Sequence, residues 1–260
     1  MHVNTMIQAL GLPQLFITFT FSERWPQLAA ILRATDNNDT LPPNRPLHVT
    51  LHWYERLSHI KDHILTNTKY SNFGKLLHYV ERQEFQQRGA FHSHNAYWVE
   101  KSIPELITTH FIRADMPDPH FEPELWSAVN KHQIHTCVTR LCGGPVTEGQ
   151  CKKGFPAPLN PATHNNNDQL RYTYRRTKPD DQYVVPYIPL LLLAMDSHMN
   201  AQYVSSRGFA KYMTKYMLKK EPGGIFNVRE PGNSAEAYRS HISARRMSSL
   251  EVMALLLGNP

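Results

Sequence analysis

The feature that most constrains the fold is a pair of neighbouring segments, residues 77–85 and 91–99, that both have the composition of strands. The short segment between them contains Gly89, which suits a turn, so the pair predicts a β-hairpin. An earlier run, residues 14–21 (QLFITFTF), is dominated by β-branched and aromatic residues and predicts a third, buried strand. The rest of the chain has to be organised around a sheet that contains these three strands.

Because side chains alternate between the two faces of a strand, the sequence also predicts which residues share a face. One face of the first strand is apolar and comprises Leu15, Ile17, Phe19 and Phe21. The other face is mixed and comprises Phe16, Thr18 and Thr20. The strand at residues 91–99 has one face that carries His92, His94, Ala96 and Trp98. The alternation therefore places two imidazoles side by side on one face.

Helical patterns surround these strands. They predict a helix that begins within residues 23–35, a helical stretch over 47–80, and a helix around 124–131. Two further helices are expected, one over residues 208–220 that Pro222 stops and one over 248–258 that Ser248 or Ser249 caps. Residues 184–188 resemble a strand. The mixture predicts an α+β fold, with a central antiparallel sheet and helices packed on it.

Composition limits the partners of this chain. Its 260 residues carry a formal net charge of +6 and give a sequence pI near 9.2, which suits a polyanionic partner. The longest apolar run, residues 184–195, is too short and too interrupted by proline to span a bilayer, and the first residues lack a signal-peptide pattern. No membrane association is therefore expected. The three cysteines are clustered and odd in number, which argues against a disulfide framework and favours a reducing compartment.

The two histidines of the predicted hairpin suggest a metal site. His92 and His94 share a face, and the neighbouring strand offers Glu84 or Gln86 as an oxygen ligand. Such a set, with open positions, suits Mg²⁺ or Mn²⁺ held for phosphate chemistry, and imidazole favours Mn²⁺ or a softer ion. The alternative is an ordinary polar face of a hairpin, because the His-x-His spacing alone carries little specificity.

A second candidate site lies in the predicted helix at residues 208–220. Tyr212 and Tyr216 are one helical turn apart, and a tyrosine hydroxyl can attack a phosphodiester when a metal polarises the phosphate. An adjacent stripe of lysines could hold a phosphate backbone; it comprises Lys211, Lys215 and Lys219. The alternative is a stripe that faces the core, to which Phe209 and Met213 would also belong.

All three cysteines lie close to a histidine. His135, Cys137, Cys142 and Cys151 supply four ligands of the zinc type within a segment rich in glycine and proline. Four protein ligands would leave no open position, so a structural site is expected. His132 is an alternative fourth ligand, and small buried cysteines without a metal are the alternative interpretation. No G-x-x-x-x-G-K-[ST] motif occurs, so the chain cannot act as an ATP-driven helicase by itself.

Several of these motifs occur together in the order found in the HUH rolling-circle nucleases. GLPQLFITFT resembles the first motif of that family, EFQQRGAFHSH its metal motif, and KYMTKYMLK its two-tyrosine nucleophile helix. The similarity is greater still to the Rep region of Helitron transposases, often called the Helitron helicase-like domain. Further similar segments are YRR at Tyr174, VVPYIPLLL from Val184 and HMNAQYV from His198. The sequence departs from the family pattern at Ser22, Glu23, Phe91 and Gln202.

The resemblance implies a function. His92 and His94 would bind the catalytic metal, and Tyr212 and Tyr216 would cut single-stranded DNA and keep its 5′ end covalently. The pattern around the cysteines also resembles a family feature, which supports structural zinc. Basic residues that include Arg88 and the lysine stripe would hold the strand. We further expect a nuclear protein and a helicase domain downstream, as in the family.

These expectations combine into one interpretation. An HUH endonuclease-like core would comprise residues 1–100 and 183–260, and residues 101–182 would form a zinc-binding insertion. The core would nick and join DNA through a 5′-phosphotyrosine in rolling-circle-type transposition. Two alternatives stay open. One is a catalytically inactive, zinc-stabilised module that binds single-stranded nucleic acid, and the other is a metal-dependent hydrolase in which water replaces tyrosine.

Overall fold

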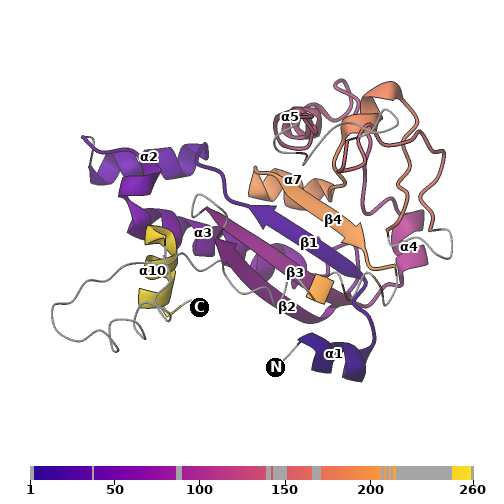
Figure 1. Ribbon diagram of the computed structural model, residues 1–260, viewed down its shortest axis with the longest axis horizontal. Coiled ribbons are helices and arrows are strands. Elements are labelled where there is room, and N and C mark those ends of the chain that lie inside the picture. Colours follow the sequence, from indigo (N-terminus) through magenta and orange to yellow (C-terminus); the bar gives the residue numbers. More distant parts are fainter. Residues whose placement is uncertain are drawn as a thin grey trace, which may run out of the picture.

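The computed structural model describes residues 3–36, 38–85, 90–138, 142, 151–165, 171–205, 208, 211, 213–214 and 248–258. Within them, a four-stranded antiparallel sheet forms the centre of the fold, and its strand order is β2-β3-β1-β4 (Figure 1). The strands are β1 (Leu15–Thr20), β2 (Leu76–Phe85), β3 (Phe91–Val99) and β4 (Met199–Tyr203). Flanking helices complete the predicted α+β fold, which is confirmed.

The three strands predicted from the sequence are all present, and the register aligns their polar residues. Thr20 of β1 lies opposite His92 of β3, and Glu84 of β2 lies opposite the same histidine from the other side. Thr18 lies opposite His94. Because opposite residues in an antiparallel sheet share a face, the threonines, the histidines and Glu84 all point to one side.

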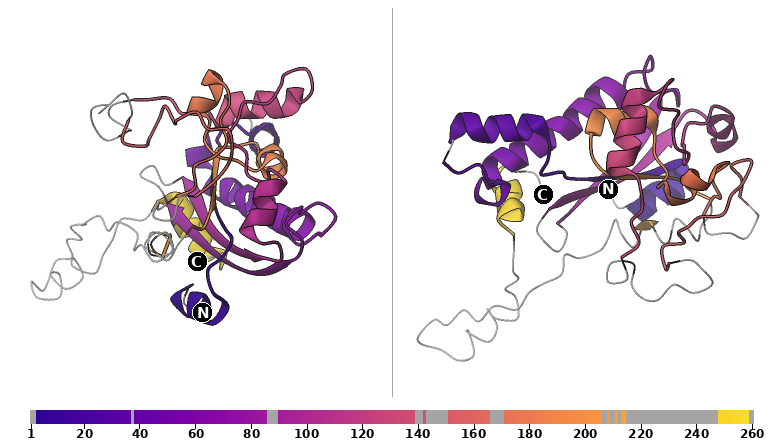
Figure 2. Two further views of the ribbon diagram at one scale, coloured as in Figure 1. Left: turned by 90° about the vertical axis from the view of Figure 1, so that its right-hand side faces the viewer. Right: turned by 90° about the horizontal axis from the view of Figure 1, so that it is seen from above.

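The other face of the sheet carries the main core. The odd-numbered apolar residues of β1, Leu15, Ile17 and Phe19, are buried there as predicted. The helices α3 (Pro46–Ile60), α4 (Ile103–Thr108), α5 (Pro123–His132) and α7 (Pro189–Met195) add buried side chains to the same core. The ribbon in Figure 2 shows helices packed against this side of the sheet. The histidine face has a smaller apolar cluster, to which α1 (Val3–Leu10) contributes Met6.

Proline and serine define where the helices begin. α2 (Pro26–Thr35), α3, α5 and α7 each begin with a proline, whose fixed φ suits the first helical position and whose missing N–H would have no helical partner there. The helix α10 (Ser249–Leu256) begins after Ser248, whose Oγ accepts a hydrogen bond from the Glu251 N–H at 3.1 Å. This N-cap confirms the prediction for the last helix.

The predicted helical stretch over residues 47–80 is wrong in its second half. Helix α3 continues as a π-helical turn, η2 (Lys61–Leu65), and then ends, and β2 begins at Leu76. Two residues between them have positive φ, Asn72 at 51° and Gly74 at 78°, and an α-helix has no place for either. Gly74 also lies against Glu100, so that an added Cβ would clash with the Glu100 carboxylate.

Two other segments differ from expectation. Residues 184–188 form no strand of the sheet, and only isolated bridges join Val184 to Ile134 and Tyr187 to Arg113. The strand β4 was not predicted, although it pairs with β1 from Leu15 to Phe19. Two short 3₁₀ turns, η1 (Pro42–Asn44) and η3 (Pro179–Tyr183), complete the described elements.

The division into a core and an insertion over residues 101–182 stays a prediction. Helices α4 and α5 lie within that range, and their residues Leu106, Leu125 and Val129 share the main core with the sheet. Among the helices that the structure describes, none combines the length and the apolar character needed to cross a membrane.

Candidate functional site

The histidine face holds a compact polar group at one end of the sheet. The rings of His92 and His94 lie with centroids 4.7 Å apart and nearly perpendicular. His94 Nε2 lies 2.7 Å from Glu84 Oε2, which brings β2 and β3 together at this point. His92 Nδ1 forms a 3.0 Å hydrogen bond with the Thr20 hydroxyl of β1. Three adjacent strands therefore contribute to one site.

The environment keeps His92 uncharged. Burial, reinforced by the neighbouring His94, lowers the pKa of His92 to about 3 although Glu84 acts in the opposite direction. A neutral imidazole has a free electron pair on one ring nitrogen, which is the form that binds a metal. Thr20 fixes the orientation of this ring, as hydrogen-bonding partners of metal-binding histidines commonly do.

The donor set fits a divalent metal, because two imidazoles and one carboxylate are its usual protein ligands. His92, His94 and Glu84 would hold the ion. In the present geometry Glu84 bonds to His94 directly. Among the described residues, the group of three or more His, Cys, Asp or Glu side chains that lie closely enough to hold a metal is a different cluster. Gln86, the other predicted oxygen ligand, lies outside the described residues.

The predicted nucleophiles, Tyr212 and Tyr216, also lie outside the described residues, as do Lys215, Lys219 and Arg88. Met213 is described, however, and it is completely buried. It packs in the smaller apolar cluster with Phe16, Ala96 and Trp98, all on the histidine face of the sheet. Lys211 is exposed. Met213, which directly follows Tyr212 in the sequence, is thus anchored to the face that carries His92 and His94.

The different cluster is the predicted set of one histidine and three cysteines. The ligand atoms of His135, Cys137, Cys142 and Cys151 all lie within 4.8 Å of one another. The Sγ atoms of Cys137 and Cys142 are 3.8 Å apart, and His135 Nε2 lies 3.5 Å from Cys142 Sγ and 3.4 Å from Cys151 Sγ. A tetrahedral zinc ion separates two sulfurs by ~3.8 Å and a sulfur from a nitrogen by ~3.6 Å, given bonds of ~2.3 and ~2.05 Å. The four residues therefore form a site that could bind zinc.

The surroundings of this cluster favour the thiolate form of one cysteine, Cys151. Burial would raise the pKa of Cys151, but the backbone N–H groups of Phe155 and Lys153 outweigh it and lower the pKa to about 6. The neighbouring Cys151 in turn raises the pKa of Cys137 to about 12. The ring of His135 stacks on Phe155 at 4.3 Å between centroids, which fixes its orientation.

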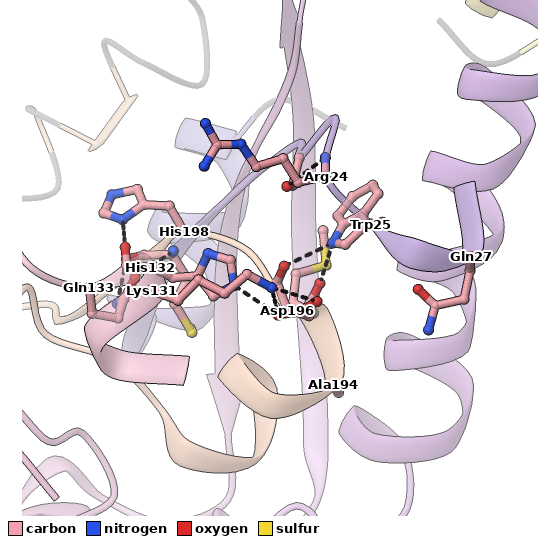
Figure 3. A network of polar contacts seen from close by, with 12 residues as sticks. Arg24, Trp25, Gln27, Lys131, His132, Gln133, Ala194, Asp196 and His198 are labelled. Atoms are coloured by element: carbon pink, nitrogen blue, oxygen red, sulfur yellow. Dashed lines mark hydrogen bonds and ion pairs between the residues drawn. The ribbon is translucent and has the colours of Figure 1, made fainter. Parts of the chain in front are cut away.

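His132, the alternative zinc ligand, has another partner. Its Nε2 lies 2.8 Å from Asp196 Oδ1, and Lys131 Nζ lies 3.0 Å from the same oxygen (Figure 3). Asp196 ends α7 in the left-handed conformation with φ of 46°. Burial would raise the pKa of Asp196, but the bonds from His132 and Lys131 outweigh it and lower that pKa. Trp25 Nε1 donates to the Asp196 carbonyl at 2.9 Å, which joins this network to the start of α2.

Sequence reasoning did not assign Thr20 or Asp196 to any site. The predicted face of β1 already included Thr20, and a correct register with β3 would have placed it beside His92. No sequence pattern indicated the contacts of Asp196, because they depend on where α5 and α7 meet.

The fold and the histidine face define a class: an α+β domain whose antiparallel sheet offers histidine and carboxylate ligands on one side. Comparison adds a similarity to a known family, since residues 1–96 match the family model of the Helitron helicase-like domain at N-terminus. No curated protein matches the chain. The family match confirms the predicted resemblance and includes Glu84, His92 and His94, whereas the cysteine cluster and the tyrosines lie beyond it.

Proposed function

We propose that this chain is a metal-dependent endonuclease and strand transferase for single-stranded DNA. It would act in rolling-circle-type transposition and hold the cut strand as a 5′-phosphotyrosine on Tyr212 or Tyr216. The observation that carries the proposal is the position of Met213. Its burial against Phe16 and Trp98 supports a nucleophile segment lying over the face that carries the two histidines.

The reaction requires a group that attacks and a group that leaves. The tyrosine oxygen forms a bond to phosphorus, the bond from phosphorus to the 3′ oxygen breaks, and the departing 3′ oxygen takes up a proton. The result is a protein joined to the 5′ phosphate and a free 3′ hydroxyl. Attack by another 3′ hydroxyl reverses the step and joins a strand. Two tyrosines would allow two such bonds to exist at once.

The residues of the histidine face would prepare the phosphate. His92, His94 and Glu84 would hold Mn²⁺ or Mg²⁺, which supplies polarisation of the scissile phosphate when bound. Thr20 orients His92, and burial keeps that ring neutral. Lys211, Lys215, Lys219 and Arg88 would hold the backbone of the strand by charge, in keeping with the net charge of +6.

The cysteine cluster would serve a structural role in this proposal. Zn²⁺ bound by His135, Cys137, Cys142 and Cys151 would have no open position for a substrate. We also propose that a helicase domain acts with this chain, because the chain has no phosphate-binding loop of its own. A nuclear location follows from the same proposed role in transposition.

One gel assay tests the proposed function. The chain is incubated with labelled single-stranded oligonucleotides and Mn²⁺ or Mg²⁺, denatured, and examined for a covalent protein–DNA adduct. We expect an adduct that disappears with EDTA and in the Tyr212→Phe/Tyr216→Phe double variant. Binding with steep salt dependence but no adduct would instead identify the inactive binding module. Cleavage that survives the double variant would identify a hydrolase that uses water.

A further inference from the structure

A cavity of about 610 Å³ lies on the side of the sheet opposite to the histidine face. Its lining residues Leu65, Phe73, Phe111 and Leu191 belong to the main core, whereas Phe16 and Trp98 on the histidine face belong to the other apolar cluster. The cavity forms where η2, the turn before β2, the segment after α4 and the start of α7 meet. A ligand bound there could not share the proposed cleavage site.

The wall of this cavity has an apolar part and a basic part. One part is apolar and aromatic, with Phe73, Phe111 and Ile188 among its residues. Another part carries basic side chains, Lys101, His110, Arg113 and Arg175. Pockets for small organic ligands usually combine an apolar wall with a few placed polar groups, and this volume lies within their ordinary range.

The positive charges of these basic residues are not equally balanced by nearby carboxylates. Arg113 bonds to Asp115 at 2.8 Å and to Glu122 at 2.7 Å, so its charge is already balanced. Lys101 Nζ donates to the Asn72 carbonyl at 2.8 Å, and that carbonyl is neutral. Within the described residues, no carboxylate lies within 4.0 Å of the charged groups of Lys101 or Arg175. The cavity thus has two positive charges that an anion could balance.

Two residues at the cavity have an unfavourable backbone conformation. Asn72 and His110 both line it, and both have φ of 51°. Such residues cost energy and persist where the surrounding structure holds them. At Asn72 this conformation has a visible consequence, because its carbonyl is the group that binds Lys101 and directs that side chain.

We propose that this cavity binds one nucleotide of an unpaired strand. The apolar and aromatic wall would take the base, and Lys101 and Arg175 would take a phosphate, the combination by which proteins hold single-stranded DNA without reading its sequence. The choice of DNA rests on the proposed function. The same chemistry would accept a free nucleoside monophosphate, so the experiment has to separate the two sources.

Binding without cleavage tests this proposal. Isothermal titration calorimetry of the full chain, without chelator and without added Mn²⁺ or Mg²⁺, uses three ligands: a 5′-deoxynucleoside monophosphate, a short oligonucleotide and inorganic phosphate. The variants Lys101→Gln and Arg175→Gln each remove one charge from the cavity. Arg33→Gln is the matched control, because it removes the same charge from an exposed position in α2 outside the cavity. Thermal unfolding checks that each variant is folded.

We expect each cavity variant to weaken nucleotide binding about tenfold or more, as loss of a hydrogen bond to a charged group does, and Arg33→Gln to leave it nearly unchanged. An effect on the oligonucleotide alone identifies a strand, and an effect on the monophosphate as well identifies a site that also takes free nucleotides. Equal binding of inorganic phosphate, or equal effects of all three variants, overturns the proposal. Because this assay measures binding and adds no metal for cleavage, a missing covalent adduct in the other assay leaves this result unaffected.

Discussion

Zinc binding by the cysteine cluster can be predicted quantitatively. In a regular tetrahedron, the distance from the centre to a corner is the edge divided by about 1.63. The 3.8 Å between Cys137 Sγ and Cys142 Sγ therefore gives about 2.3 Å, which equals the usual length of a Zn–S bond. A disulfide needs sulfurs only ~2.05 Å apart, so these cysteines are spaced for a metal and not for a covalent bond.

The perturbation is Cys142→Ser, which replaces one buried sulfur ligand. Protein purified without chelators should contain about one zinc per chain, and X-ray absorption should show three sulfurs at ~2.3 Å and one nitrogen at ~2.05 Å. The variant should lose one sulfur and bind zinc more weakly. Because zinc binds the folded state, a free zinc concentration of 100 times the Kd adds ~2.7 kcal/mol to the free energy of unfolding. A variant that binds zinc more weakly is stabilised less at the same zinc concentration.

His132→Gln is the matched control, because His132 bonds to Asp196 and lies outside the cluster. It should keep one zinc per chain and the same sulfur count. The reasoning is refuted if wild-type protein binds much less than one equivalent of zinc. It is also refuted if Cys142→Ser has no effect on the sulfur count, or if His132→Gln removes the zinc.

Three further predictions concern buried contacts. Asp196→Asn removes the charge but keeps a residue type that tolerates positive φ. Because the carboxylate is one-third exposed, we expect the free energy of unfolding, measured with denaturant, to fall by only about 1 kcal/mol. The folded state lowers the pKa of Asp196, so this difference should be complete at neutral pH and disappear as the pH falls below 3.8; a constant difference would contradict it. Met213→Ala should lower the free energy of unfolding by about 2 kcal/mol or more and reduce adduct formation, whereas an unchanged melting temperature would mean that Met213 is not buried. Arg176→Gln should cost about 3 kcal/mol, because its Nη1 donates to the carbonyls of Ala114 and Val184 inside the protein, and a loss below 1 kcal/mol would count against these bonds.

Strand alternation made the histidine face predictable. The period of two placed His92 and His94 on one face and Ile17 and Phe19 in the core before any pairing was known. The hairpin register places Glu84 opposite His92, and the contact of its carboxylate with His94 depends on the side-chain conformation that the structure shows. Local sequence therefore placed the two histidines on one face, whereas the contacts of Thr20 and Glu84 with them depend on how the strands pair.

Contacts between distant segments were not predictable in the same way. β4 is only five residues long, and it follows a left-handed residue, Asp196, whose conformation depends on contacts with Trp25 and His132. The distances within the cysteine cluster likewise depend on how the chain folds back between Cys142 and Cys151. The prediction of a helix over residues 47–80 was wrong in its second half. The spacing of the apolar residues there fits a helix and a strand alike, and the chain turns at Asn72 and Gly74.

The polarity of the covalent bond tests the central claim most directly. A single-stranded oligonucleotide carries a label on its 5′ end or on its 3′ end, and each form is incubated with the chain and Mn²⁺ before denaturation. Attack by Tyr212 or Tyr216 retains the fragment that bears the 5′ phosphate, so we predict that only the 3′ label stays with the protein. Retention of the 5′ label, or of either label by the Tyr212→Phe/Tyr216→Phe variant, would contradict the account.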